Sequence, residues 1–197
     1  MTDFVHLHLH SEYSLLDGAV KVDELIEHCV KNGIDTVALT DHGNMYASLY
    51  FAEECKRNKI KYIIGCEFYV VNDYTVKETQ SADHLILLAK NKTGYINLVQ
   101  LDSLAFVDGY YYRPRIDYNV LKEHSEGVIC LSACLAGRIP RLLMADDYEG
   151  AKKFALEMKG IFGEDFYLEI QDHGIPEQKR ILPMMIRLAE ETGIELV

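Results

Sequence analysis

Residues 5–11 read Val-His-Leu-His-Leu-His-Ser, and this alternation of histidines with apolar residues is the most informative stretch of the chain. Side chains of a strand alternate between its two faces, so His6, His8 and His10 share one face of a strand predicted over Phe4–His10. His8 and His10 can both reach one metal ion at the end of that strand, whereas His6 lies further back. A solvated face is the alternative, but the period-two spacing before a polar turn favours a metal site.

Strand-like and helical runs alternate along the rest of the chain. We expect further strands at Thr36–Thr40, Lys61–Val71, His84–Ala89, Val128–Ser132 and Phe166–Ile170, and the start of a seventh at Gly193–Val197. We expect helices at Val22–Asn32, Ala47–Asn58, Tyr95–Ala105, Tyr148–Phe162 and Pro176–Thr192. The order predicts an α/β fold with a largely parallel sheet in a single domain spanning residues 1–197. A closed barrel and an open doubly wound sheet both fit, and residues 110–117 look like an irregular aromatic and basic loop.

Polar residues also follow the second predicted strand and interrupt the third. Asp41 and His42 come directly after the second strand, where functional residues of parallel α/β folds gather. Asp41 could orient a histidine or bridge metals, and an Asx turn or helix cap is its structural alternative. Glu67 lies inside an otherwise apolar and aromatic strand, where an unpaired carboxylate is costly to bury. It needs a cation, a metal or an exposed edge, and its position favours a metal.

A cluster of histidines and carboxylates suits two or three divalent ions such as Zn²⁺ or Mn²⁺, with Mg²⁺ or Fe²⁺ as further candidates. Such sites typically hydrolyse phosphoesters by polarising the phosphate and activating a water. Arg113 and Arg115 could add a phosphate clamp. A solvated loop or an interdomain contact is the alternative for both arginines.

The composition restricts the possible functions. The 197 residues carry 20 Lys+Arg against 31 Asp+Glu, a formal net charge of −11, which argues against a simple electrostatic grip on nucleic acid. The hydrophobic fraction of 49% supports a real core and excludes a disordered tail. No apolar run is long enough for a membrane span, and the five cysteines without an export signal favour the cytoplasm. A metal cluster could still attract a phosphate that the acidic surface repels.

Several motifs resemble, in order, those of the polymerase and histidinol phosphatase (PHP) domain. They are residues 5–18 (VHLHLHSEYSLLDG), 39–45 (LTDHGNM), 64–69 (IGCEFY), 84–91 (HLILLAKN), 111–117 (YYRPRID) and 131–137 (LSACLAG). They are most similar to the N-terminal PHP domain of bacterial DNA polymerase III alpha subunits. The resemblance implies a distorted (βα)₇ TIM-like barrel. It also implies a metal-ligand set of His8, His10, Asp17, His42, Glu67, His84 and Cys134, with Asp41 in support.

The resemblance also concerns the end of the chain. The family carries an Asp-x-His motif at the end of strand seven, which would follow Gly193–Val197. We therefore expect a C-terminally incomplete fragment of a much longer polymerase subunit, truncated in or just before the end of strand seven and weak or inactive alone. Asp172-His173 lacks the intervening residue, and we expect an ordinary loop pair there.

Three functions follow from the resemblance. The first is a metal-dependent 3′–5′ exonuclease that proofreads at the DNA 3′ end, with Asp17, His42 and Asp41 as catalytic residues. The second is a metal-binding structural module that braces the rest of the polymerase chain and docks partners, including a separate proofreading exonuclease subunit; a sliding clamp would be reached through other domains. The third is a free-standing phosphoesterase of the histidinol-phosphatase type.

Overall fold

A computed structural model of the chain describes residues 4–15 and 17–197. Its strands are β1 (Thr36–Leu39), β2 (Lys61–Val71), β3 (Asp83–Ala89), β4 (Arg115–Asp117), β5 (Val128–Leu131) and β6 (Phe166–Tyr167). Its helices are α1 (Val22–Asn32), α2 (Ser48–Arg57), α3 (Lys92–Val107), α4 (Tyr118–Glu123), α5 (Arg138–Met144), α6 (Tyr148–Phe162) and α7 (Pro176–Thr192), with a 3₁₀ turn at Gly163–Asp165. The α/β class is as predicted. None of these helices is both long and apolar enough to cross a membrane, within the part of the chain that is described.

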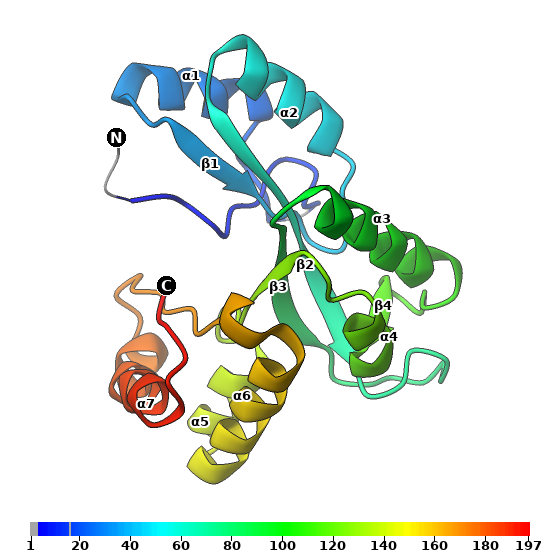
Figure 1. Cartoon of the computed structure of the whole chain (residues 1–197), viewed down its shortest axis with the longest axis vertical. Coiled ribbons are helices and arrows are strands. Elements are labelled where there is room, and N and C mark those ends of the chain that lie inside the picture. Colours follow the sequence, from blue (N-terminus) through cyan, green and yellow to red (C-terminus); the bar gives the residue numbers. More distant parts are fainter. Residues whose placement is uncertain (1–3, 16) are drawn as a thin grey trace.

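The strands form one mixed sheet in the order β1-β2-β3-β5-β6, and β4 pairs with β2 outside that path. Strands β1 and β4 run parallel to β2, and β5 runs parallel to β6. Strand β3 runs antiparallel to both of its neighbours, β2 and β5. Figure 1 shows α1 and α2 beside β1, α3 and α4 beside β4, and α5 to α7 at the other end of the sheet.

The prediction of a largely parallel sheet is therefore wrong at β3. The connection from β2 to β3, residues 72–82, contains no helix. A parallel return needs a crossover of a dozen or more residues, usually helical, whereas a helix-free connection returns the chain antiparallel. The prediction of an irregular loop over residues 110–117 is also wrong in part, because its last three residues form β4.

The histidine-rich segment is extended but is not a strand, so the prediction of a strand over Phe4–His10 is wrong. It lies beside β1 through two backbone hydrogen bonds, from Ala38 N to His6 O at 3.0 Å and from Thr40 N to Leu9 O at 2.9 Å. Between these two hydrogen bonds the segment advances by three residues and its neighbour by only two, and the chain bends at His8. An extra residue of this kind interrupts a ladder locally and re-aims the side chains around it.

The described part of the sheet does not close into a barrel, because β1 and β6 end its path. The chain end extends the β6 edge: Leu168 N donates to Glu195 O at 2.9 Å, and Val197 N donates to Leu168 O at 3.0 Å. The predicted start of strand seven is thus an isolated parallel bridge between Leu168 and Leu196, not a strand. Figure 1 shows the histidine-rich segment and the chain end on the same side of the molecule.

The two faces of the sheet have different roles, which follow from the alternation of side chains along β2 and β3. Phe68 of β2 and Leu87 of β3 point outward into the main core, which the helices cover. Ile86 points to the inner face, within a smaller apolar cluster that includes Ala38 and Leu131. Glu67 pairs with Ile86 across the two strands and shares that inner face. The inner face therefore ends in polar groups at one end of the sheet.

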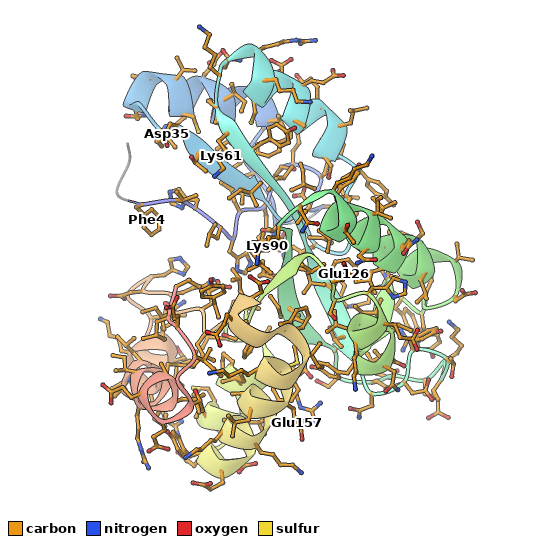
Figure 2. The ribbon with its side chains drawn as sticks, viewed as in Figure 1. Phe4, Asp35, Lys61, Lys90, Glu126 and Glu157 are labelled. Carbon is orange, nitrogen blue, oxygen red and sulfur yellow. The ribbon has the colours of Figure 1, made fainter. Side chains whose placement is uncertain are left out.

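The opposite ends of the strands lie away from these groups. Lys61 begins β2, Lys90 follows β3 and Glu126 precedes β5, and Figure 2 labels all three. The predicted helices agree with α1, α6 and α7 over their full bounds. Gly33 ends α1 with φ +66°, a conformation that glycine adopts without strain. Helices α4 and α5 were not predicted.

Candidate metal centre

Glu67 lies at the centre of the polar end of the inner face and is fully buried. Its Oε2 lies 2.8 Å from His8 Nε2. Its Oε1 lies 2.6 Å from His42 Nδ1 and 2.5 Å from His84 Nδ1. The four side chains come from the N-terminal segment, the end of β1, the middle of β2 and the start of β3. One carboxylate thus faces imidazoles on both of its oxygens.

The backbone aligns Glu67 with the turn after β1. Glu67 N donates to Asp41 O at 3.0 Å, and Gly43 N donates to Glu67 O at 2.8 Å, so His42 sits directly beside the carboxylate. Gly43 has φ +57°, and a Cβ there would lie 2.9 Å from the Pro114 side chain. The glycine after the histidine therefore permits both the turn and its close packing.

Two sets of ligand atoms converge here. His8, His10 and Glu67 form one group, and His42, Glu67 and His84 form the other, with the ligand atoms of each group within 4.8 Å of one another. His10 Nε2 lies 3.1 Å from His8 Nε2 and 3.6 Å from Glu67 Oε2. Imidazole nitrogens and carboxylate oxygens are ligands that zinc and manganese take in proteins.

Unpartnered atoms support a metal at this position. Glu67 Oε1, His42 Nδ1 and His10 Nδ1 are buried and make no hydrogen bond. Glu67 Oε1 and His42 Nδ1 face each other at 2.6 Å without the angular geometry of a hydrogen bond. Buried polar atoms are normally satisfied, so lone pairs that converge without donors fit a divalent cation. The residues present therefore fit the divalent metals expected from the sequence.

The charges of the cluster are strongly coupled. Burial raises the pKa of Glu67, but the close contacts with His42, His8 and His84 outweigh it and hold the pKa well below its usual range. Burial lowers the pKa of His8, but hydrogen bonds to Glu169 and Glu67 raise it overall to about 9. Burial and the neighbouring His42 lower the pKa of His10. The cluster thus holds an ionised carboxylate between imidazoles of differing basicity.

Two further residues implied by the resemblance lie at the rim. Asp17 Oδ2 is 2.7 Å from His42 Nε2, and the aspartate is more than half exposed. Cys134, which follows β5, has its Sγ 3.9 Å from His84 Nδ1. Burial raises the pKa of the Cys134 thiol to about 11, so it would need a metal to act as a thiolate. Both side chains are brought to the cluster, outside the two convergent groups.

Asp41 points away from the cluster, into the loop before it. Its carboxylate accepts hydrogen bonds from Ser11 N at 2.6 Å, Ser11 Oγ at 2.8 Å and Ser14 Oγ at 2.7 Å. Ser14 Oγ in turn accepts from His42 N at 3.0 Å. Asp41 therefore joins the loop after His10 to the turn that carries His42, which is a supporting position and not a contact with the converging atoms.

The two arginines of the predicted phosphate clamp are placed differently. Arg113 is exposed, and its guanidinium lies 4.6 Å from the ring centroid of Tyr69, which neighbours His42 and His84. Arg115 is buried, and its guanidinium donates to the carbonyl oxygens of four residues, Tyr74, Val76, Glu78 and Gly109. Of these two arginines, only Arg113 is free to meet a phosphate. The guanidinium of Arg115 is occupied by three carbonyls of the connection between β2 and β3 and by that of Gly109.

Glu169 is a site residue that the sequence reasoning missed. It lies just after β6, is 7% exposed, and places Oε1 2.7 Å from His8 Nδ1. Its signal was the one used for Glu67, a carboxylate among the apolar residues of a predicted strand. His6 stays apart as expected, with its ring against Phe4. Asp172 and His173 are in a loop, where Asp172 accepts from Gly174 N and His173 N donates to Gln178.

Comparisons with known proteins agree with these features. Residues 6–173 match the PHP domain family. The chain is 46% identical to DNA polymerase III subunit alpha of Treponema pallidum and of Borreliella burgdorferi, over 98% of its own length and 17% of theirs. It is 40% identical to the same subunit of Aquifex aeolicus, over 99% of its length and 18% of that protein. The chain thus spans less than a fifth of the length of these relatives.

A structural comparison supports the fold alone. The chain matches a Bifidobacterium adolescentis protein, described as a metal-dependent phosphoesterase, with a TM-score of 0.57 and 15% identity. The match covers 99% of this chain and 86% of that one.

Proposed function

The chain belongs to the PHP domain family, and from that membership we propose that it is the PHP domain of a bacterial DNA polymerase III alpha subunit with a centre for phosphodiester hydrolysis. The observation that carries the hydrolytic function is the placement of Glu67, whose two oxygens each face a separate pair of histidines. These residues would hold two divalent ions, with Zn²⁺ or Mn²⁺ as the first candidates. Asp17 and Cys134 would contribute to holding a third ion.

When bound, a pair of divalent ions supplies Lewis-acid chemistry, which polarises a phosphate and lowers the pKa of water. The chain would contribute His8, His10 and Glu67 to one ion and His42, Glu67 and His84 to the other. Asp17, exposed and 2.7 Å from His42, is the carboxylate placed to take a proton at the rim. Asp41 keeps the loop and the His42 turn together.

A cavity next to His84 suits the substrate. Its volume is about 480 Å³, and its lining includes His84, Tyr112, Arg113 and Arg141. Arg113 would hold a phosphate there by charge-assisted hydrogen bonds. Tyr112 is 82% exposed and offers a ring on which a terminal base can stack. A 3′ end of DNA therefore fits the cavity better than a small compact phosphate ester, and proofreading 3′–5′ exonuclease activity is the proposed role.

The test uses the longer polymerase subunit of which we expect this chain to be a part. A primer with a mismatched 3′ nucleotide and a 5′ fluorophore is incubated with Mn²⁺ or Zn²⁺, without nucleotides. We expect stepwise shortening from the 3′ end, abolished by His8→Ala with His10→Ala. Shortening equal to that of the double variant would contradict the proposal, as would turnover of histidinol phosphate in its place.

One observation favours a bracing role instead. The contact of His8 with Glu169 links the N-terminal segment to the chain beyond β6, across the open edges of the sheet. Metals bound to His8 would strengthen that link and support the rest of the polymerase chain. A chelator should then lower the melting temperature and the polymerase activity of the subunit while no 3′ shortening is seen with any metal.

A further inference from the structure

Glu169 lies behind His8 on a backbone that is held on both sides. Its own N–H donates to Ser132 Oγ at 2.9 Å. Its two neighbours pair with the chain end, through Leu168 N to Glu195 O at 2.9 Å and Ile170 N to Val197 O at 2.8 Å. The backbone that carries the carboxylate therefore has a fixed position before any ligand arrives.

The two ring nitrogens of His8 face different groups. Nδ1 is 2.7 Å from Glu169 Oε1, whereas Nε2 is 2.8 Å from Glu67 Oε2 and 3.1 Å from His10 Nε2. A carboxylate accepts hydrogen bonds, so Nδ1 carries the proton that Glu169 receives. Nε2 faces the Glu67 carboxylate and carries a proton as well in the metal-free chain, and a metal would replace that proton while Nδ1 keeps its own. The Nε2 lone pair would then be directed at the group that His10 and Glu67 complete.

Gln171 fixes the carboxylate in turn. Its Nε2 donates to Glu169 Oε1 at 2.7 Å, and its Oε1 accepts from Gln178 Nε2 of α7 at 3.4 Å. The line of contacts thus runs from α7 through Gln171 and Glu169 to His8. Each of these side chains is held in place by a hydrogen bond with the preceding one.

His8 needs such a partner more than the other histidines. The backbone bends at His8, and the backbone hydrogen bonds from β1 and Thr40 go to His6 and Leu9 instead. The backbone of residue 8 is therefore not fixed by regular strand pairing, and a rotated imidazole would turn Nε2 away from Glu67. Histidine ligands of metals usually donate their other N–H to a carboxylate, which fixes both tautomer and ring orientation.

We propose that Glu169, backed by Gln171, is a positioning residue that holds His8 in the Nδ1–H tautomer and aims Nε2 at the metal. This rests on the proposed metal centre of Glu67 and its histidines. It goes further in assigning a role to a residue outside the ligand set that the sequence and its family resemblance supplied.

The test is the affinity of the chain for Zn²⁺, measured by competition with a chromophoric chelator. Glu169→Ala should weaken the tightest zinc site roughly 10–100-fold, the usual effect of removing an outer carboxylate. Glu169→Gln keeps an oxygen that accepts from both His8 and Gln171, so it should retain most of the affinity. Glu191→Ala is the control and should leave zinc binding unchanged. It removes a carboxylate of α7 that pairs with Lys152 of α6 and Arg187 of α7.

A second readout follows the tautomer itself. Nitrogen-15 NMR of the zinc-loaded chain should show His8 with a protonated Nδ1 in the wild type and in Glu169→Gln, and a mixture of states in Glu169→Ala. Equal loss of affinity in both Glu169 variants would overturn the positioning role and make Glu169 a direct ligand. Unchanged affinity in Glu169→Ala would overturn it as well.

The failure of the metal centre would look different. If His8→Ala with His10→Ala binds Zn²⁺ as tightly as the wild type, the proposed centre is wrong whatever the Glu169 variants do. If that double variant loses zinc and Glu169→Ala does not, only the positioning role fails.

Discussion

Glu67 Oε2 lies 2.8 Å from His8 Nε2, and this contact connects the middle of the longest strand to a segment that forms no strand of its own. The carboxylate is fully buried, so its charge depends on the imidazoles around it. Every group of converging ligand atoms found in the described residues includes it. Glu67 is therefore the side chain on which the whole centre depends.

Replacing Glu67 with glutamine should abolish metal binding at both groups. The amide keeps the volume but presents a weaker ligand and an N–H that opposes one imidazole. We expect the zinc content after gel filtration, measured by mass spectrometry, to fall close to zero. Glu126→Gln, on the exposed loop before β5, is the matched control and should keep the wild-type content. Full zinc content in Glu67→Gln would show that the ligands lie elsewhere.

The metal-free chain should lose stability as the pH rises from about 6.5 to about 9. The folded-state pKa of His8 is raised to about 9 by its contacts with Glu169 and Glu67, which outweigh its burial. A histidine whose pKa is higher in the folded than in the unfolded chain stabilises the fold fully below the unfolded pKa, and this stabilisation is lost as the pH passes the folded pKa. A pKa shift of this size corresponds to roughly 3 kcal/mol of unfolding free energy. Urea unfolding in EDTA at several pH values measures it.

The same experiment has a variant that isolates the effect. His8→Gln removes this titration, so its unfolding free energy should fall less across this window than that of the wild type. The slope that remains belongs to His42, whose pKa is lowered by burial but raised overall by Glu67 and Asp17. Zinc affinity of the wild type should rise over the same range, since a metal must displace the proton on the nitrogen that it binds. A wild-type stability that rises with pH in EDTA would contradict the assignment to His8.

The two neighbouring arginines should behave in opposite ways. Arg115→Ala removes a buried guanidinium that donates to four carbonyl oxygens, and we expect a loss of about 3 kcal/mol or more in unfolding free energy. Arg113→Ala removes an exposed side chain and should change stability by less than about 0.5 kcal/mol. Shortening of the mismatched primer by the longer subunit should fall only with Arg113→Ala. Equal destabilisation by both variants would contradict the distinction between them.

Asp41→Ala should disorder the loop that follows His10, although Asp41 touches no converging ligand atom. The N–H and the hydroxyl of Ser11 and the hydroxyl of Ser14 lose their acceptor, which should lower the unfolding free energy by about 2–4 kcal/mol in total. Asp41→Asn keeps one acceptor oxygen, so its unfolding free energy should lie between those of the wild type and Asp41→Ala. Chemical unfolding measures the loss of stability, and zinc titration measures the accompanying loss of metal affinity. Wild-type values of both in Asp41→Ala would contradict the supporting role.

Local signals predicted the helices well. Gly33 and Gly193 end α1 and α7, Pro176 begins α7, and the predicted bounds of these helices match the structure. Caps and periodicity act within a few residues, so they are readable from the sequence. The match to the PHP domain family confirms the resemblance that the ordered motifs indicated.

Strand direction and the outer contacts of the site were not readable in the same way. His84 stands at the start of β3 and not after its end, and it joins the cluster only because β3 runs antiparallel to β2. The lack of a helix between the two strands was the available signal. Glu169 carried the same local signal as Glu67, but its contact with His8, 161 residues away in the sequence, is one that no local pattern reports.

That separation has a consequence for how the protein is made. His8 leaves the ribosome 161 residues before Glu169. The centre cannot reach its final geometry until nearly all of the sheet has formed, because contacts between distant residues close late and slowly. Metal captured with full affinity therefore marks a finished fold, and a nascent or clipped chain would hold its metal loosely or release it.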